Sequence, residues 1–284
     1  MKSTRAVADD RRIFQKLGFS SMKAGLRAKN SLHGKSSLYE LFHENTKLGK
    51  LRTRAYSTWA ADYQRIRQSR GALVGVKVYT LMERHALPRV EAQTDLERAI
   101  AARRSTRSFS GLPLAVDDLA RMLFFGYGRT GAQSRAVASG GALYPLELYV
   151  AAFNVDGLQP GVYHYGIETG HLDVVRAGDC REALKGVVNF SGIDIDRASL
   201  AIVIAAAFQR TTIKYLDRGY RMILMEAGEV AQNFCLLAAS MNLGVCLLGG
   251  FQDDHLSEIL DIDGVEEAPL VAMVAGRVPA RSGS

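Results

Sequence analysis

The chain has 284 residues, of which 48% are hydrophobic and 23% charged, enough apolar material to bury the core of one large domain or of one domain with an extension. The three cysteines, Cys180, Cys235 and Cys246, form no CxxC pair and have no histidines at ligand spacing, which argues against a disulfide framework and a zinc site, and we predict no bound metal. The first residues lack the apolar stretch of a signal peptide and no segment approaches about 18 continuous apolar residues, so we predict a cytoplasmic protein with no membrane partner.

The net charge of +7 is divided unevenly along the chain. Residues 1–90 hold 19 Lys or Arg against 6 Asp or Glu, a balance of +13, whereas residues 91–284 hold 17 against 23, a balance of −6. Pro88 interrupts helix near this boundary. We predict a basic, helical N-terminal extension over 1–90 that docks a partner or peptide, and a separate domain over 91–284. A solvated basic face is the alternative for the extension, and no nucleic-acid-binding module accompanies its charge.

The first predicted elements are helical. Basic, weakly amphipathic stretches of the extension predict helices over 11–26, 37–47 and 57–68. Thr94 and Glu97 have the spacing of a capping box, which predicts a helix that runs to Arg103. A further helix is expected over 115–126.

The second half of the chain alternates strands with one long helix. Hydrophobic segments predict strands over 146–153, 161–165, 171–175, 200–208, 245–248 and 270–276. The longest helix is expected over 216–242. Helices mixed with antiparallel strands in this way indicate the α+β class.

A short loop after the helix near residue 100 concentrates anion-binding side chains. Arg103, Arg104, Ser105 and Arg107 bring three guanidinium groups and a hydroxyl together. Arginine forms bidentate hydrogen bonds to phosphate, and serine can add a hydroxyl to the same oxyanion. Arg277, at the end of the last predicted strand, supplies a second candidate phosphate contact. An arginine-rich surface loop is the alternative, but two separated arginine sites favour phosphate binding.

The run 139–147 (SGGALYPLE) places two adjacent glycines between a polar residue and a hydrophobic turn. Because glycine has no Cβ, backbone here can approach a flat ligand closely, which favours a flavin site. An ordinary glycine turn that enters a strand is the alternative. The candidate cofactor contacts of this run are Ser139, Gly140, Gly141, Ala142 and Leu143.

These motifs, together with Gly249, Gly250 and Gly276–Arg277, occur in the order and rough spacing of the flavin-dependent nitroreductase superfamily, which the chain resembles over residues 94–278. The segments 214–221 (KYLDRGYR) and 226–233 (EAGEVAQN) look like the SagB-type azoline dehydrogenases of that superfamily. The segment 42–47 (FHENTK) looks like the amino-terminal signature of the same branch. Ala138 departs from the proline that this branch has before Ser139.

The resemblance implies a nitroreductase-like antiparallel sheet flanked by helices, and a domain-exchanged homodimer with one FMN at each of two subunit interfaces. The FMN phosphate would contact Arg103, Ser105, Arg107 and Arg277, and the glycine run would lie beside the flavin ring. Gly249 and Gly250 would bring backbone donors near its reactive nitrogen. Gln232 and Asn233 would orient the site from the long helix, or would form a polar stripe that faces a partner subunit.

The SagB-type branch oxidises thiazoline or oxazoline rings of modified peptides to azoles. This chemistry needs a protein base, and the Lys214–Tyr215 pair is the catalytic hypothesis, with either residue as the base. The alternative is a surface lysine beside a helix-capping tyrosine. Expected partners are an azoline-containing peptide and a cyclodehydratase. An NAD(P)H-dependent nitro or quinone reductase and an inactive scaffold of a peptide-modifying complex remain the other functional hypotheses.

Overall fold

The computed structural model describes residues 38–49, 58, 77, 79, 81–132, 134–188 and 192–280. The helices predicted over 11–26 and, apart from Thr58, over 57–68 lie outside these residues. The helix predicted over 37–47 is confirmed as α3 (Leu38–Thr46).

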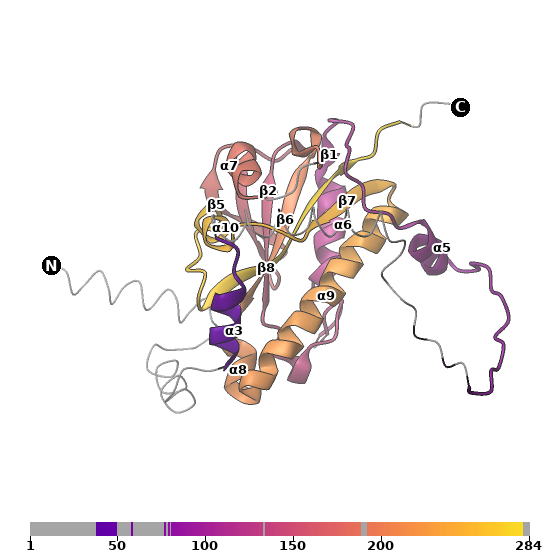
Figure 1. The fold of residues 1–284 in the computed structure, drawn as a ribbon. Coiled ribbons are helices and arrows are strands. Elements are labelled where there is room, and N and C mark those ends of the chain that lie inside the picture. Colours follow the sequence, from indigo (N-terminus) through magenta and orange to yellow (C-terminus); the bar gives the residue numbers. More distant parts are fainter. Residues whose placement is uncertain are drawn as a thin grey trace.

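Within the described residues, a six-stranded antiparallel sheet forms the centre of the molecule (Figure 1). Its strands are β2 (Leu146–Ala152), β4 (Gly161–Gly166), β5 (His171–Ala177), β6 (Leu200–Ala207), β7 (Leu243–Leu248) and β8 (Glu267–Arg277). They lie in the order β5-β4-β2-β6-β8-β7, and each neighbouring pair is antiparallel. Two short strands, β1 (Leu114–Ala115) and β3 (Val155–Asp156), pair in parallel beside it. The predicted strands and the α+β class are confirmed.

Both faces of the sheet are covered by helices, which explains why the strands read as apolar runs. In β6, Leu200, Ile202 and Ile204 face one hydrophobic cluster, whereas Ala201 and Val203 face the other. Successive strand residues point to opposite faces, so a fully buried strand must be apolar at every position. The first cluster is closed by α6 (Val116–Tyr127) and α9 (Asp217–Ser240), and the second by α7 (Arg181–Val187) and α10 (Asp253–Leu260).

The long helix α9 crosses one face of the sheet (Figure 1). Its buried side chains recur at helical spacing and include Ile223, Ala227, Val230 and Phe234. By length and mean hydropathy α9 could cross a membrane, but 44% of its most apolar window is buried inside the protein, as in a core helix. The helix also carries charged residues in its first three turns. We therefore treat α9 as the core helix of the fold.

Local signals place the helix ends. The helix α5 (Asp95–Ala102) begins at the predicted capping box, in which the Thr94 hydroxyl accepts the Glu97 N–H and the Glu97 carboxylate accepts the Thr94 N–H. The short helices α7, α10 and α8 (Gln209–Tyr215) were not expected from the sequence. In α8 the β-branched run Thr211–Ile213 disfavours helix, and burial of the first two of these residues overrides that preference.

The described part of the N-terminal extension packs on the body of the protein. The Tyr39 N–H donates to Asp217 Oδ1 at 3.2 Å, at the start of α9. The buried ring of His43 lies 3.2 Å from the Tyr220 hydroxyl through Nδ1 and 4.8 Å from the Phe208 ring centroid. Lys47 donates to the carbonyl of Gly264 at 2.6 Å. The helix α3 therefore braces the junction between α8 and α9.

Two helical glycines give a matched test of the packing between α6 and α9. A Cβ on Gly126 of α6 would lie 2.8 Å from Cζ of Phe234, whereas a Cβ on Gly228 of α9 meets nothing within 4 Å. We expect Gly126→Ala to lower the free energy of unfolding by about 1–3 kcal/mol through overpacking. Gly228→Ala should raise it by about 0.5–1 kcal/mol because alanine favours helix. Urea denaturation measures both, and equal effects at the two positions would contradict this packing.

Candidate functional site

The arginine segment, residues 103–107, runs beside the edge strand β7. The Thr106 N–H donates to the carbonyl of Val245 at 2.9 Å, and Ser105 forms a parallel bridge to the same residue. The close approach depends on Gly244, since a Cβ there would lie 2.5 Å from Cγ2 of Thr106. Backbone pairing thus holds the segment and leaves its charged side chains at the edge of the sheet.

The guanidinium groups of this segment differ in the hydrogen bonds that they form with the described residues. Arg104 donates to the carbonyls of Ala101 and Arg103 at 2.9 and 2.8 Å, so it caps the end of α5. Arg107 has one weak contact, 3.5 Å to the carbonyl of Ser105. The Arg103 side chain forms no hydrogen bond or ion pair with the described residues, and its charge partly offsets the rise that burial causes in the pKa of Cys235. Arg103 and Arg107 therefore retain donors for an anion.

Arg277 joins this group at the end of β8. It pairs in register with Leu243 of β7, and its carbonyl accepts the Ser110 N–H at 2.9 Å. Its Nε donates to the carbonyl of Pro113 at 2.9 Å, and one Nη lies 3.9 Å from the Asp118 carboxylate. The structure thus brings Arg277 to the same end of β7 as the arginine segment.

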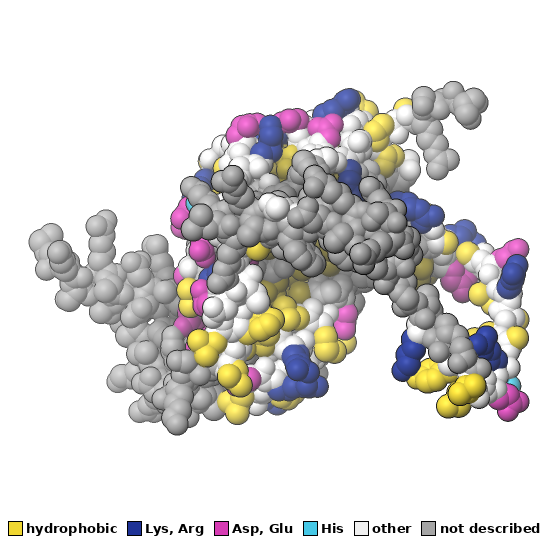
Figure 2. Space-filling view, in the orientation of Figure 1, with side chains coloured by type: hydrophobic (Ala, Val, Ile, Leu, Met, Phe, Trp, Pro, Cys, Tyr) yellow, Lys and Arg dark blue, Asp and Glu magenta, His cyan; other side chains and the backbone are white. Residues whose placement is uncertain are grey.

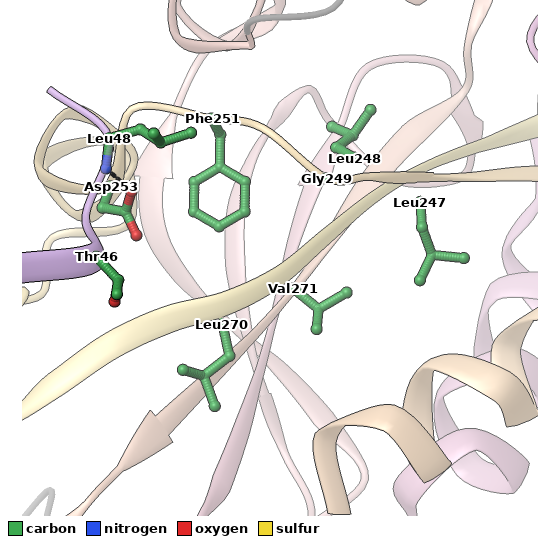
Figure 3. Close-up of a pocket in the computed structure, with 9 residues that line it drawn as sticks. All are labelled: Thr46, Leu48, Leu247, Leu248, Gly249, Phe251, Asp253, Leu270 and Val271. Atoms are coloured by element: carbon green, nitrogen blue, oxygen red, sulfur yellow. Dashed lines mark hydrogen bonds between the residues drawn. The ribbon is translucent and has the colours of Figure 1, made fainter. Parts of the chain in front are cut away.

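An apolar cavity of about 330 Å³ opens at the other end of β7 (Figure 3). Thr46 and Leu48 border it from the segment around the end of α3, where the Leu48 N–H donates to Asp253 Oδ2 at 2.9 Å. Gly249 lies at its rim, and a Cβ there would meet nothing within 4 Å. Its apolar walls are Leu247, Leu248, Phe251, Leu270 and Val271. Gly250 follows directly and is buried.

The glycine turn, residues 139–143, lies against the Lys214–Tyr215 pair. It contains a short 3-10 helix (Gly140–Ala142) in which Gly141 has φ +67°. A Cβ on Gly141 would lie 2.6 Å from the Tyr215 hydroxyl and 2.8 Å from Nζ of Lys214. The fold therefore brings together two motifs that are far apart in the sequence. Lys214 is exposed at the end of α8, with its Nζ 5.1 Å from the Tyr215 ring centroid.

Backbone strain gathers around this contact. Ala142, Tyr144 and Leu216 have positive φ values of 56°, 46° and 49° although none is glycine. Leu216 separates α8 from α9 directly after Tyr215. Such conformations cost about 1–3 kcal/mol each and persist only where the surroundings determine them, often at functional sites.

The buried carboxylate of Glu226, which the sequence motifs did not place at the site, supports the glycine turn. Glu226 on α9 accepts the Ser139 hydroxyl at 2.6 Å and the Tyr127 hydroxyl at 2.7 Å. Burial raises its pKa, although these two hydrogen bonds and the charge of Arg135 oppose the rise. One signal in the sequence could have identified it, since Glu226 interrupts the apolar stripe of α9.

The other predicted residues lie away from this contact. Gln232 is exposed on α9. The Asn233 side chain donates to the carbonyl of Gly126, near the end of α6, at 3.2 Å. Glu147, the last residue of the glycine run, points to the opposite face of the sheet. There it binds His164 at 2.8 Å and Arg210 at 2.5 Å beside a separate cavity of about 350 Å³.

The predicted residues therefore form two groups. Arg103 of the first group acts electrostatically on Cys235 of α9, whereas the glycine turn of the second contacts Met222. These two α9 positions are separated by about 20 Å at 1.5 Å per helical residue. No residue of the glycine turn or of the Lys214–Tyr215 pair lines the apolar cavity.

Comparison with known proteins identifies the family of the chain. The model of the nitroreductase family matches residues 100–277. MJ1384 of Methanocaldococcus jannaschii, provisionally named a nitroreductase, is 38% identical over 192 residues, 67% of this chain and 94% of MJ1384. McbC of Escherichia coli, named a microcin B17-processing protein, is 30% identical over 152 residues, 52% of this chain and 56% of McbC. The chain thus spans little more than half of McbC.

A solved structure supports the same fold. In the E. coli microcin synthetase McbBCD complex with truncated pro-MccB17 bound, one chain has a TM-score of 0.54 and 22% identity, over 83% of this chain and 99% of that chain. Such identity shows the fold alone. The predicted nitroreductase-like fold, an antiparallel sheet flanked by helices, is confirmed by the family match and by this likeness.

Two glycines with positive φ test the contact between the glycine turn and the Lys214–Tyr215 pair. Gly141→Ala and Gly157→Ala both place an L-residue at positive φ, +67° and +78°, at a cost of about 1 kcal/mol. Only the first clashes with side-chain atoms, since a Cβ on Gly157 meets nothing within 4 Å. The atoms that it meets, the Tyr215 hydroxyl and the Lys214 Nζ, are the far ends of side chains that can move, so we expect Gly141→Ala to cost at most about 1 kcal/mol more than Gly157→Ala in the free energy of unfolding, measured by urea denaturation. A larger loss in Gly157→Ala than in Gly141→Ala would contradict the contact of the turn with the pair.

Proposed function

The chain belongs to the nitroreductase family, whose members are FMN-dependent oxidoreductases, and we propose that it binds FMN and oxidises thiazoline or oxazoline rings of a modified peptide to azoles. The observation that carries this proposal is the contact of Gly141 with Lys214 and Tyr215. That contact joins a turn suited to a flat ring with two groups able to move a proton. Membership of the SagB-type branch is part of the proposal, and similarity to McbC supports it.

The residues at the two ends of β7 fit FMN. At the first end, Arg103 and Arg107 retain donors, and Arg277 presents a guanidinium already oriented by Pro113 and Asp118. Charge-assisted hydrogen bonds from such groups suit a phosphate. At the other end, the apolar cavity beside Gly249 offers the low-polarity wall that a flat ring needs.

We further propose that the site is completed in a homodimer. The glycine turn and Lys214–Tyr215 lie apart from the arginine segment in one chain, so a second copy can supply them. An exposed apolar surface is available for such an interface: Leu224 and Met225 of α9 are 41% and 65% exposed, and Phe42 of α3 is 57% exposed. Figure 2 shows apolar side chains gathered over this face. Contiguous apolar surface of this kind marks an association site.

The reaction divides between cofactor and protein. When bound, FMN supplies the two-electron acceptor for the hydride that leaves the azoline ring. The ring must also lose a proton to the protein. The groups beside Gly141 are Lys214 and Tyr215, and either can take that proton only as a neutral amine or a phenolate, or after relaying its own proton onward. Lys214 forms no ion pair with the described residues, so its amine is available to the substrate. Both residues lie at the end of α8, directly before Leu216 with its positive φ.

The partners proposed for the chain follow from the same likeness. The McbBCD structure holds a truncated microcin precursor, and we propose that this chain likewise acts on a peptide beside a cyclodehydratase. The balance of +13 over residues 1–90 would attract an acidic peptide or partner surface. We also retain a cytoplasmic location, and two separate parts over 1–90 and 91–284, as proposals. An NAD(P)H-dependent reductase is the second candidate, favoured by the identity with MJ1384.

The phosphate assignment predicts the effect of removing one charge. Arg107→Gln should weaken FMN binding by about 10- to 100-fold, because a charge-assisted hydrogen bond to phosphate is lost. Fluorescence titration of FMN measures this. Arg107 suits the test better than Arg277, because its guanidinium forms one long hydrogen bond with the described residues whereas that of Arg277 also holds Pro113 and Asp118. The control is Arg176→Gln on β5, at the opposite edge of the sheet. Equal FMN affinity in wild type and Arg107→Gln would remove this residue from the site.

The base assignment predicts loss of turnover with FMN retained. Lys214→Ala and Tyr215→Phe should lower the rate of azole formation by about 10²- to 10⁴-fold for whichever residue takes the proton. Mass spectrometry follows the loss of two hydrogens from an azoline peptide. Lys185→Ala, at a partly exposed lysine on α7 that pairs with Glu182 and Asp196, is the control. Full activity in both variants would exclude the pair from the mechanism.

The anaerobic visible spectrum of the FMN-loaded chain separates the two candidate functions. Flavin absorption that NADPH leaves unchanged and an azoline peptide bleaches is the expected result. Rapid bleaching by NADPH alone would instead establish the reductase. A chain that neither holds nor takes up FMN would contradict both and favour the inactive scaffold.

A further inference from the structure

Glu226 occupies an unusual position for a charged side chain. It is 3% exposed and lies on the stripe of α9 that also buries Ile223, Ala227 and Val230. A carboxylate in such surroundings is costly unless it is fully hydrogen-bonded. The turns before and after it show that an apolar residue would suit the packing, so the carboxylate needs another explanation.

Each oxygen of this carboxylate accepts a hydrogen bond from a hydroxyl, and each of these hydroxyl oxygens accepts one from a backbone N–H. Oε2 accepts the Ser139 hydroxyl, whose oxygen accepts the Tyr144 N–H at 2.9 Å. Oε1 accepts the Tyr127 hydroxyl, whose oxygen accepts the Leu146 N–H at 3.3 Å. One side chain on α9 therefore ties the entrance of the glycine turn to its exit at β2.

The tied segment carries the strain described above. Gly141, Ala142 and Tyr144 all have positive φ and lie between the two anchored ends. A strained turn keeps its shape only while its surroundings hold it. The shape matters because Gly141 lies against Lys214 and Tyr215, so a shift of the turn would displace the surface that faces both.

We propose that Glu226 is a positioning residue whose carboxylate, through Ser139 and Tyr127, holds the glycine turn in place against Lys214 and Tyr215. The proposal rests on the function proposed above. Glu226 acts through other residues and itself touches neither substrate nor cofactor. Ser139 is then an anchor for the turn, with its hydroxyl hydrogen already donated.

The role requires the ionised carboxylate. Protonated glutamic acid, like glutamine, donates a hydrogen through one of its two polar atoms. The hydroxyl facing that atom would then lose the strong carboxylate acceptor for its own hydrogen. The charged or titratable groups around the carboxylate are Tyr127 on α6, Arg135 on the following loop and Glu229 on α9. Arg135 lies 5.1 and 4.4 Å from the Tyr127 and Tyr144 ring centroids and favours the ionised form.

The negative charge of Glu226 does not add to the stability of the fold. Burial raises the pKa of Glu226 above its unfolded value. The folded chain therefore binds this proton more tightly than the unfolded chain, and the associated stability is present at low pH and is lost as pH rises through the raised pKa. Ionisation of Glu226 is therefore less favourable in the folded chain than in the unfolded chain, so its negative charge adds no stability of its own.

The test compares Glu226→Gln with Glu229→Gln in the full-length, FMN-loaded protein. Glu229 lies almost one turn further along α9 and is exposed, so its substitution removes the same charge and leaves the turn intact. Hydrogen exchange at the Tyr144 and Leu146 amides should accelerate by about 10-fold or more in Glu226→Gln and stay at the wild-type rate in Glu229→Gln. Ser139→Ala should accelerate exchange at Tyr144, and it provides a second variant if Glu226→Gln does not fold.

Turnover supplies the readout that a structural role would not move. In Glu226→Gln we expect kcat for azole formation to fall by about 10- to 100-fold with KM nearly unchanged, because misplaced groups lose orientation. Wild-type kcat should fall on the acid side of the raised pKa of Glu226, and this acid limb should be absent from Glu226→Gln. Unchanged exchange, or faster exchange with unchanged kcat and pH profile, would overturn the proposal. A wild-type protein that binds FMN but does not oxidise azolines would instead overturn the proposed function, and exchange would still decide whether Glu226 holds the turn.

Discussion

The burial of α9 against the sheet is the interaction on which the rest of the structure depends. Its apolar stripe covers the face formed by alternate residues of β2, β6 and β8. Around this contact the other elements are placed: α6 meets α9 at Phe234, α3 at Tyr220, and the glycine turn at Met222. Because interiors are close-packed, each of these neighbours has little freedom to move. The position of the candidate site is therefore a consequence of core packing.

One departure from apolar packing lies beside the candidate site. Glu226 takes the place of an apolar residue on the stripe of α9, and Ala142 and Tyr144, in the turn that it ties, adopt positive φ. A second polar network, around Glu147, His164 and Arg210, lies on the opposite face of the sheet. The two networks meet at Tyr144, whose carbonyl accepts a hydrogen bond from Arg210 and whose N–H donates to the Ser139 hydroxyl. Polar contacts therefore hold the turn from both faces of the sheet.

The two groups of candidate residues lie at different levels along α9, and this separation constrains how a site can be assembled. A single chain offers an arginine segment and an apolar cavity at the two ends of β7, and a turn with a proton-carrying pair elsewhere. Family membership explains the fold but leaves the substrate open, because similar folds carry different reactions. The proposal of azoline oxidation rests on the local contact between Gly141, Lys214 and Tyr215.

The sequence by itself determined the local elements with strong signals: the capping box at Thr94, the buried strand over 200–207, the long helix after Leu216 and the motifs of a flavin family. These follow from periodicity and short-range hydrogen bonds, which a linear pattern contains. It missed α8, whose β-branched residues favour strand, because long-range burial outweighs local propensity there. Only the tertiary structure placed Gly141 against Lys214 and Tyr215, and only it gave Glu226 its two hydroxyl partners. Those contacts join residues far apart in the chain, and the packing of α9 and α8 on the sheet decides which of them meet.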